Sequence, residues 1–177
     1  MSIEVKEKKD TTKLYIETCN DKIALPNYEN IGYIGMNIQS AANVIIMPKE
    51  TKIIPTGLKI SIPEGYELQV RTTNDLLLNT PLRVSTSPIF IDNDYHGELG
   101  IIMSNTSSDM YWDSDSKTMK NVKDSMYSWY HRSINQKNNT PGIYEIKVGD
   151  IIAKIVLTKV ETVEIEKVKK DMVKTLR

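Results

Sequence analysis

The chain has 177 residues, of which 40% are hydrophobic and 26% charged, as is ordinary for a soluble globular protein. Its 23 basic and 23 acidic residues cancel, so the composition provides no global field that would attract nucleic acid or an anionic membrane. A chain of this length builds one domain with a proper core and leaves little room for a second. We therefore expect a single domain over residues 1–177.

The cysteine content and the amino terminus bear on where the protein acts. Cys19 is the only cysteine, which excludes an intrachain disulfide and a cysteine-based metal site and fits a reducing compartment. The charged start "MSIEVKEKKD" lacks the apolar core of a signal peptide. No segment approaches the roughly 20 apolar residues of a membrane span. The sequence predicts a cytoplasmic protein (in the host cytoplasm, if it is viral) without a membrane or nucleic-acid partner.

Short segments rich in β-branched residues recur from the amino terminus onward. Pro, Gly, Asn and Asp, which turns require, punctuate them at 47–50, 62–66 and 92–97. Many short strands at close spacing are typical of a sandwich, jelly roll or barrel, so we expect an all-β fold. The predicted strands are 13–18, 43–47, 51–62, 66–70, 98–104, 143–147 and 151–159.

A polar insert covers about residues 105–140, yet aromatic residues cluster within it. Long excursions in compact domains are usually functional or disordered. Two interpretations stay open: the rings pack as a satellite of the core, or they form a recognition surface for a protein partner or a nucleobase. In the tail, 160–177, the apolar residues fit a helical stripe and a strand-like alternation equally. The predicted recognition residues are Tyr111, Trp112, Tyr127, Trp129 and Tyr130.

Four blocks, in order, resemble the trimeric dUTPases. They are 25–41 ("LPNYENIGYIGMNIQSA"), 54–70 ("IPTGLKISIPEGYELQV"), 86–105 ("TSPIFIDNDYHGELGIIMSN") and 146–157 ("IKVGDIIAKIVL"). The resemblance implies a jelly-roll β-sandwich of the β-clip type, assembled as a homotrimer with active sites between subunits. Some phage-type members of that family carry inserts between the third and fourth motifs, where they serve partner binding.

The third block keeps two functional positions of the family. Asp92 stands where the family has the aspartate that activates the attacking water, and an ionised carboxylate there can act as general base. Tyr95 matches the tyrosine that packs on the deoxyribose. The family's glycine, which lets the backbone approach the base, is Ile89 here, so the pocket is reshaped. The predicted ligand pocket comprises Asn37, Ile89, Phe90, Ile91 and Tyr95.

The phosphate-binding motifs of the family are altered. The second motif, P-R-S-G-L, reads "TTNDL" here, so the arginine becomes a threonine and the glycine an aspartate, which places negative charge where a polyphosphate would lie. The aspartate of the first motif is Asn37, and the glutamine of the fourth is Lys154. The glycine-rich fifth motif is absent before the chain ends. The altered phosphate site comprises Arg71, Thr73, Asn74, Asp75 and Lys154.

These changes favour a pseudoenzyme: a homotrimer that binds a nucleotide-derived ligand or a protein partner without hydrolysis. A viral trimer that sequesters a host immune nucleotide signal is one form of this anti-defence hypothesis. Two alternatives stay open. One is a divergent active dUTP diphosphatase that uses Asp92, and the other is an interaction module that acts through Trp112 and Trp129. No cofactor and no metal are expected, except Mg²⁺ if the chain is catalytic.

Overall fold

The chain is described by a computed structural model, which covers residues 12–30, 32–121, 132–133 and 142–168. Each segment that the sequence predicts as a strand contains one, so the all-β prediction is confirmed. The described elements are β1 (Tyr15–Thr18), β2 (Met36–Gln39), β3 (Val44–Ile46), β4 (Thr51–Ser61), β5 (Tyr66–Arg71), α1 (Asn74–Asn79), β6 (Leu82–Val84), β7 (Ile89–Ile91), β8 (Glu98–Asn105), β9 (Met110–Asp113), β10 (Thr118–Asn121), β11 (Arg132–Ser133), β12 (Tyr144–Ile146) and β13 (Ile151–Lys159).

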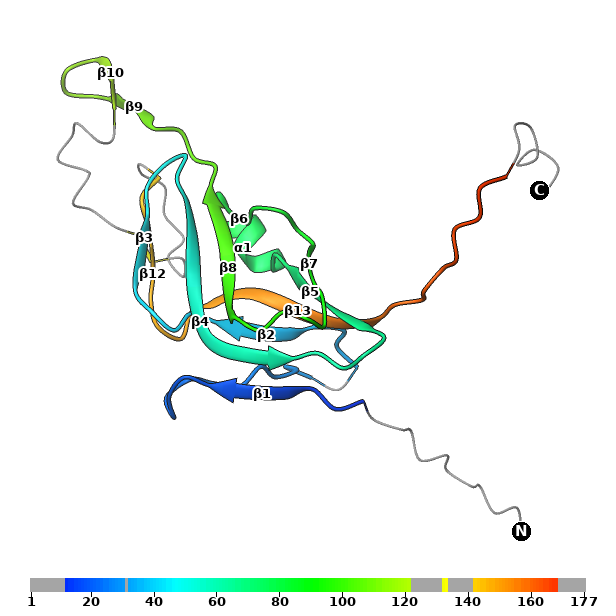
Figure 1. The fold of residues 1–177 in the computed structure, drawn as a ribbon. Helices are drawn as coiled ribbons and strands as arrows, with labels where there is room; N and C mark the ends of the chain where they lie inside the picture. Colours follow the sequence, from blue (N-terminus) through cyan, green and yellow to red (C-terminus); the bar gives the residue numbers. More distant parts are fainter. Residues whose placement is uncertain (1–11, 31, 122–131, 134–141, 169–177) are drawn as a thin grey trace, which may run out of the picture.

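Two four-stranded antiparallel sheets pack around one hydrophobic core (Figure 1). The first has the strand order β1-β4-β8-β6 and the second the order β2-β13-β5-β7. A three-stranded sheet, β11-β12-β3, and a two-stranded ribbon, β10-β9, complete the described strands. The core is aliphatic, as the β-branched composition of the strands predicts; Ile54 and Ile101 enter it from the first sheet, and Leu68 and Ile155 from the second.

Strand β4 shows how the sequence pattern becomes burial. Side chains alternate between the two faces of a strand, so Ile54 and Ile60 reach the core while their neighbours face outward. The alternation breaks at Gly57, where the register with β8 shifts. Gly57 has a φ of 67°, and its N–H donates to the Glu98 carboxylate at 2.8 Å. A glycine is favoured at this irregularity because the backbone takes a left-handed conformation there.

The turns expected from residue types are present at all three places. The Met47 N–H donates to the Glu50 carboxylate at 2.8 Å, which closes the first turn. Gly65 has a φ of 77° in the second. The Tyr95 N–H donates to the main-chain oxygen of Asp92 at 3.2 Å in the third. These turns hold β4, β5 and β8 at the spacing that the sheets require.

Helix α1 was not among the elements predicted from the sequence. Thr73 has an extended backbone (φ −77°, ψ 151°), and its hydroxyl accepts a hydrogen bond from the Leu76 N–H at 3.2 Å. At the other end the Thr80 hydroxyl donates to the Leu76 main-chain oxygen at 2.7 Å. Two threonines therefore begin and end this six-residue helix. In the part of the chain that the structure describes, no helix is long and apolar enough to cross a membrane.

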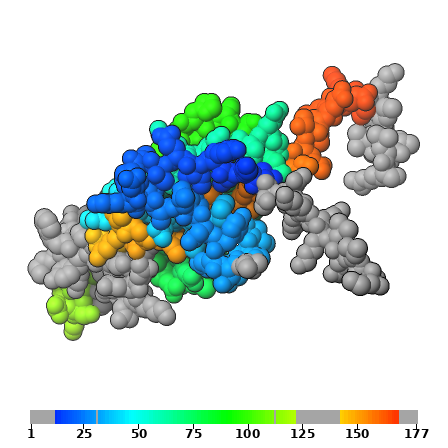
Figure 2. Space-filling view, turned by 90° about the horizontal axis from the view of Figure 1, so that it is seen from below, coloured from blue at the N-terminus to red at the C-terminus, as the bar shows by residue number. Residues whose placement is uncertain are grey.

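Residues 160–168 leave the two sheets as an exposed segment that is neither helix nor strand (Figures 1 and 2). The Val160 N–H donates to the Gly65 oxygen at 2.8 Å, which is where the segment departs. Farther along, Ile165 is 91% exposed. The described part of the tail thus adopts neither of the two conformations that its sequence fits, and residues 169–177 lie outside the described range.

Candidate functional site

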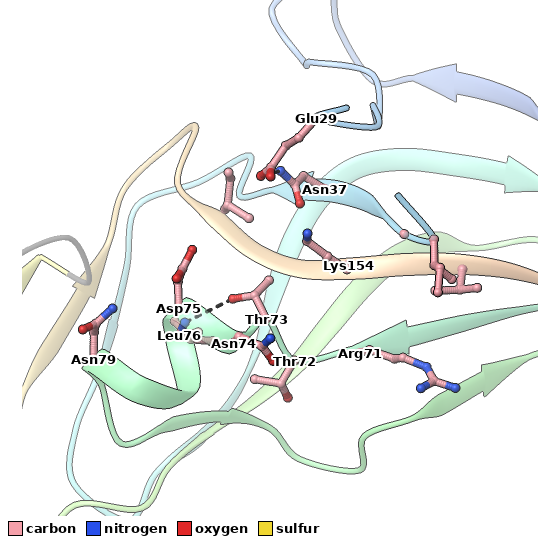
Figure 3. Close-up of a pocket in the computed structure, with 14 residues that line it drawn as sticks. Glu29, Asn37, Arg71, Thr72, Thr73, Asn74, Asp75, Leu76, Asn79 and Lys154 are labelled. Carbon is pink, nitrogen blue, oxygen red and sulfur yellow. Dashed lines mark hydrogen bonds between the residues drawn. The ribbon is translucent and has the colours of Figure 1, made fainter. Parts of the chain in front are cut away.

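A cavity of about 820 Å³ opens between β2, β13 and the segment that leads from β5 into α1 (Figure 3). It brings together the first, second and fourth motif segments, which are far apart in the sequence. The whole altered phosphate site and one residue of the predicted ligand pocket, Asn37, line it. The lining residues are Glu29, Ile34, Gly35, Asn37, Arg71, Thr72, Thr73, Asn74, Asp75, Leu76, Asn79, Ile151, Lys154 and Val156.

Three of these side chains form a row across the second sheet. Lys154 on β13 is the register partner of Asn37 on β2 and of Arg71 on β5. Side chains of residues that lie directly opposite each other in antiparallel strands project from the same face. The lysine therefore stands at the centre of the row, with a neutral amide on one side and a guanidinium on the other.

The Arg71 guanidinium is held along its own strand and does not reach towards α1. Its Nε and Nη2 both donate to the Gln69 side-chain oxygen, at 3.1 and 2.5 Å. Gln69 in turn donates to the Glu67 carboxylate at 2.5 Å. Figure 3 shows Arg71 directed away from Thr73 and Asp75. Arg71 thus lines the cavity, while two of its donor groups are engaged elsewhere.

Thr73 and Asp75 form the wall of the cavity on the side of α1. Thr73 is 7% exposed, and its hydroxyl oxygen is engaged as the helix cap. Asp75 lies in the first turn of α1, where the partial positive charge of the helix end favours a carboxylate. Where the resemblance places a phosphate-binding arginine and a glycine, this wall therefore presents a helix cap and a negative charge.

Opposite this wall, Glu29 and Asn37 are joined by a hydrogen bond. The Asn37 amide nitrogen donates to the Glu29 carboxylate at 2.5 Å. A carboxylate only accepts, so the amide nitrogen faces it and the amide oxygen Oδ1 faces the other way. That oxygen is buried and has no hydrogen-bond partner among the described residues, and Asn37 is only 7% exposed. A buried acceptor without a donor costs about 1–3 kcal/mol, so a hydrogen-bond donor placed there would stabilise the site.

The Lys154 ammonium lies over an aromatic ring. Its Nζ is 5.5 Å from the centroid of the Tyr33 ring, within the distance of a cation–π contact. Among the ion pairs of the described residues, none involves Lys154. The lysine is therefore a cation available to a ligand in this cavity.

The rest of the predicted ligand pocket lies elsewhere in the same subunit. Ile89, Phe90 and Ile91 form β7, an edge strand that pairs with β5, and the Phe90 side chain is 59% exposed. The Tyr95 hydroxyl donates to the Glu98 main-chain oxygen at 2.7 Å in the turn that follows. Asp92 is exposed at the start of that turn. None of the residues from 89 to 95 is among those that line the cavity around Lys154.

The first part of the insert forms the β9–β10 ribbon, which projects away from the two sheets (Figure 1). Tyr111 and Trp112 lie on β9. An ion pair between Lys120 and Asp113 links the two strands. Hydrogen bonds from Lys120 and from the Ser116 hydroxyl lower the pKa of Asp113 to about 2. The other predicted recognition residues, Tyr127, Trp129 and Tyr130, lie outside the described residues.

Sequence reasoning missed Glu29 and the capping role of Thr73. Glu29 is brought beside β2 by an isolated bridge between Asn27 and Asn37, and nothing in its spacing distinguishes it from other exposed acidic residues. The cap did leave a signal, because a threonine before "NDLLL" fits the start of a helix.

The oxygen atoms of the cavity do not fit a magnesium site. Mg²⁺ takes near-octahedral oxygen ligands, usually one or two carboxylates with waters and phosphates. No three His, Cys, Asp or Glu side chains of the described residues are grouped so that they would hold a metal ion. Glu29 already accepts from Asn37, and the neighbouring Lys154 ammonium repels a cation. The free Asn37 oxygen therefore suits a ligand N–H or O–H group better than a metal.

Comparison with known proteins identifies one family, by sequence over about half of the chain and by three-dimensional structure over most of it. The dUTPase family model matches residues 21–112, just over half of the chain. The deoxyuridine 5′-triphosphate nucleotidohydrolase of Fusobacterium nucleatum is 37% identical over 91 residues, which are 50% of this chain and 62% of that protein. The chain thus spans less than two thirds of the length of this relative.

Two solved structures of phage proteins are similar in three dimensions. The dUTPase of Staphylococcus bacteriophage 80alpha with dUPNHPP has a TM-score of 0.73 at 25% identity and covers 92% of this chain and 91% of its own. It is described in connection with the control of virulence-gene transfer by phage dUTPases. A mutant dUTPase from phage phi11 of S. aureus, solved with a structural Mg(II) ion, has a TM-score of 0.67 at 24% identity. The match covers 90% of this chain and 99% of that protein. At this identity the similarity is evidence for a shared fold only.

Proposed function

The chain belongs to the dUTPase family, and on this premise we propose that it binds a nucleotide-derived ligand in the cavity around Lys154 without hydrolysing dUTP. The observation that carries the proposal is the wall formed by α1. Its Thr73 hydroxyl oxygen accepts from the Leu76 N–H as a helix cap, and its Asp75 carboxylate lines the space in which the resemblance places a triphosphate. A wall of this kind repels a polyphosphate.

Hydrolysis of a triphosphate depends on positioning and charge neutralisation as much as on a base. Removal of a single preorganised donor lowers an enzymatic rate by about 10²–10³. In this cavity the arginine position holds Thr73, while the nearby Arg71 donates twice to Gln69. Lys154 is then the cation left for a ligand on the α1 side. A single point charge replaces a bidentate donor, which supports binding without turnover.

We also propose that the protein is a homotrimer. Trimers are known for the dUTPase family. Within one subunit, Asp92 and Tyr95 lie outside the cavity. A neighbouring copy that brings its Asp92 turn to the cavity would unite the two parts of the predicted site, in agreement with the intersubunit sites that the resemblance implies.

The proposed biological role is sequestration of a nucleotide signal, with the phage origin of the structural relatives as its support. A panel of linear and cyclic nucleotides tests it by thermal unfolding, followed by chromatography of each nucleotide after incubation. A ligand at 100 times its Kd adds about 2.7 kcal/mol to stability, which raises the melting temperature by several degrees. We expect such a shift for at least one nucleotide, recovered intact. Absence of any shift across the panel refutes nucleotide binding.

The second candidate function is a divergent dUTP diphosphatase. Two observations favour it. Asp92 and Tyr95 match the water-activating aspartate and the deoxyribose-packing tyrosine of the family's third motif, and relatives are named as nucleotidohydrolases. In that case Asp92 acts as general base, Lys154 contacts phosphate, and Mg²⁺ is required. This candidate predicts dUMP formation that the Asp92→Asn substitution abolishes.

Capture of a protein partner through the insert is a third role, and the projecting β9–β10 ribbon supports it. Deletion of residues 106–140 should abolish partner capture and leave the assembly of the remaining chain unchanged. Capture that survives the deletion would exclude the insert as the interface.

A further inference from the structure

We propose that the cavity selects a nucleotide with a single phosphate group and rejects a polyphosphate. The inference rests on the proposed function and names the ligand class of the same cavity. Three kinds of group on the cavity wall provide the selection: the Lys154 ammonium, the buried Asn37 oxygen that has no hydrogen-bond partner among the described residues, and the carboxylates of Glu29 and Asp75.

Lys154 provides the positive charge for one phosphate group. It has no ion-pair partner among the described residues and lies over the Tyr33 ring. A phosphate monoester carries about −1.5 to −2 charges at pH 7, so one ammonium offsets about half to two thirds of the charge of a single group. Arg71 also lines the cavity, but its side chain is directed away from Thr73 and Asp75 (Figure 3), with two N–H groups donating to Gln69, so its charge lies away from the α1 side.

The carboxylates of Glu29 and Asp75 limit how much negative charge the cavity accepts. Both residues line it, and Figure 3 shows them on different sides of the space next to Lys154. Each further phosphate brings more negative charge, while the other cation in the described lining, Arg71, is directed away from the α1 side (Figure 3). Repulsion from two carboxylates at short range then lowers the affinity with every phosphate added.

The buried oxygen of Asn37 selects in the same direction. The Asn37 oxygen Oδ1 requires a hydrogen-bond donor from the ligand. The carboxylates of Glu29 and Asp75 are likewise hydrogen-bond acceptors only. The oxygens of an ionised polyphosphate are acceptors and satisfy none of them. A nucleoside monophosphate whose phosphate contacts Lys154 carries sugar hydroxyls and base N–H groups close to that phosphate. The acceptors of the wall therefore match the part of the ligand that follows a single phosphate.

Isothermal titration of the purified protein with dUMP, dUDP and dUTP, in EDTA at one fixed low ionic strength, tests this selection. We expect the affinity to fall from dUMP to dUTP by about tenfold or more. Asp75→Asn, which removes the charge and keeps the size, should tighten dUTP binding by about tenfold and change dUMP binding less. Lys154→Met should weaken dUMP binding by about tenfold or more.

Lys147→Met is the matched control, since Lys147 is a lysine outside the cavity that pairs with Glu145. We expect it to leave all three affinities unchanged, and circular dichroism checks that each variant is folded. The comparison of nucleotides on the unsubstituted protein needs no variant. Equal or tighter binding of dUTP than of dUMP overturns the inference, and so does binding of other nucleotides without binding of dUMP. Binding of other nucleotides without binding of dUMP would leave the proposed function intact. Production of dUMP from dUTP, in contrast, would refute the proposed function itself.

Discussion

Replacement of Thr73 by valine separates a structural role of this residue from a ligand-binding role. The change keeps the shape of the side chain and removes the hydroxyl that accepts from the Leu76 N–H at 3.2 Å. If Thr73 is a helix cap, stability falls while nucleotide affinity stays. If its hydroxyl binds the ligand, affinity falls as well.

The structure sets the size of the effect on stability. Loss of an N-cap costs about 0.5–2 kcal/mol. Leu76 is only 5% exposed, so water does not readily replace the lost acceptor and the upper part of the range applies. We expect the free energy of unfolding to drop by about 1–2 kcal/mol for each chain. In a chain of this size the melting temperature falls by about 2–4 °C for each kcal/mol, so the shift is about 2–8 °C.

Urea unfolding and thermal unfolding at equal protein concentration measure the effect, since the stability of an oligomer depends on concentration. Thr73→Ser, which keeps the capping hydroxyl, is the matched control and should lose less than the valine variant. Unchanged stability of Thr73→Val combined with lost nucleotide binding would refute the capping argument and return Thr73 to the ligand site.

Three further predictions concern stability and pH. Asn105 is 1% exposed, and its amide nitrogen donates to two main-chain oxygens. Asn105→Ala should therefore lower the free energy of unfolding, measured in urea, by about 2–4 kcal/mol, and a loss below about 1 kcal/mol would contradict this. Gly57→Ala should lower the free energy of unfolding by about 1–2 kcal/mol in the same assay, because φ is 67° and the new Cβ would lie 2.9 Å from the Ile23 side chain. Unchanged stability would argue against a left-handed backbone at Gly57. The pKa of Asp113 is lowered from 3.8 to about 2 on folding, so its ion pair with Lys120 supports the β9–β10 ribbon fully above about pH 4 and loses that support as the pH falls towards 2. Amide exchange of the ribbon should show this loss, and the loss should be smaller in Lys120→Met, in which the hydrogen bond from Ser116 remains.

The longer strands of the fold were predictable from their residues. In β13, Ile152 and Ile155 are fully buried, and the run of β-branched residues around them indicates a strand in any setting. The short strands β1, β3 and β12 were also predicted, because each lies in a segment rich in β-branched residues, whereas β2 and β7 were not. Strands β2 and β7 form because β13 and β5 present unpaired edges to them, and an edge contributed by a distant segment is not visible in local sequence.

The lining of the cavity was predictable in part: Glu29 was missed, and the predicted pocket residues between Ile89 and Tyr95 do not line it. Asn37, Thr73, Asp75 and Lys154 were each identified from motif positions, and all four line one cavity. The direction of the Arg71 side chain depends on contacts along β5 that spacing does not encode. The place of Asp92 relative to the cavity stays a prediction, because it depends on a neighbouring copy of the chain.

The central claim, a dUTPase-family cavity without hydrolysis, is tested most directly by a turnover measurement. Purified protein at high concentration is incubated with dUTP and Mg²⁺, and dUMP is quantified by chromatography beside an Asp92→Asn variant. We predict that the two proteins give the same result, with no dUMP above the level without protein. Formation of dUMP by the unsubstituted protein that disappears in Asp92→Asn would show that the altered phosphate site still supports catalysis, and would contradict the claim.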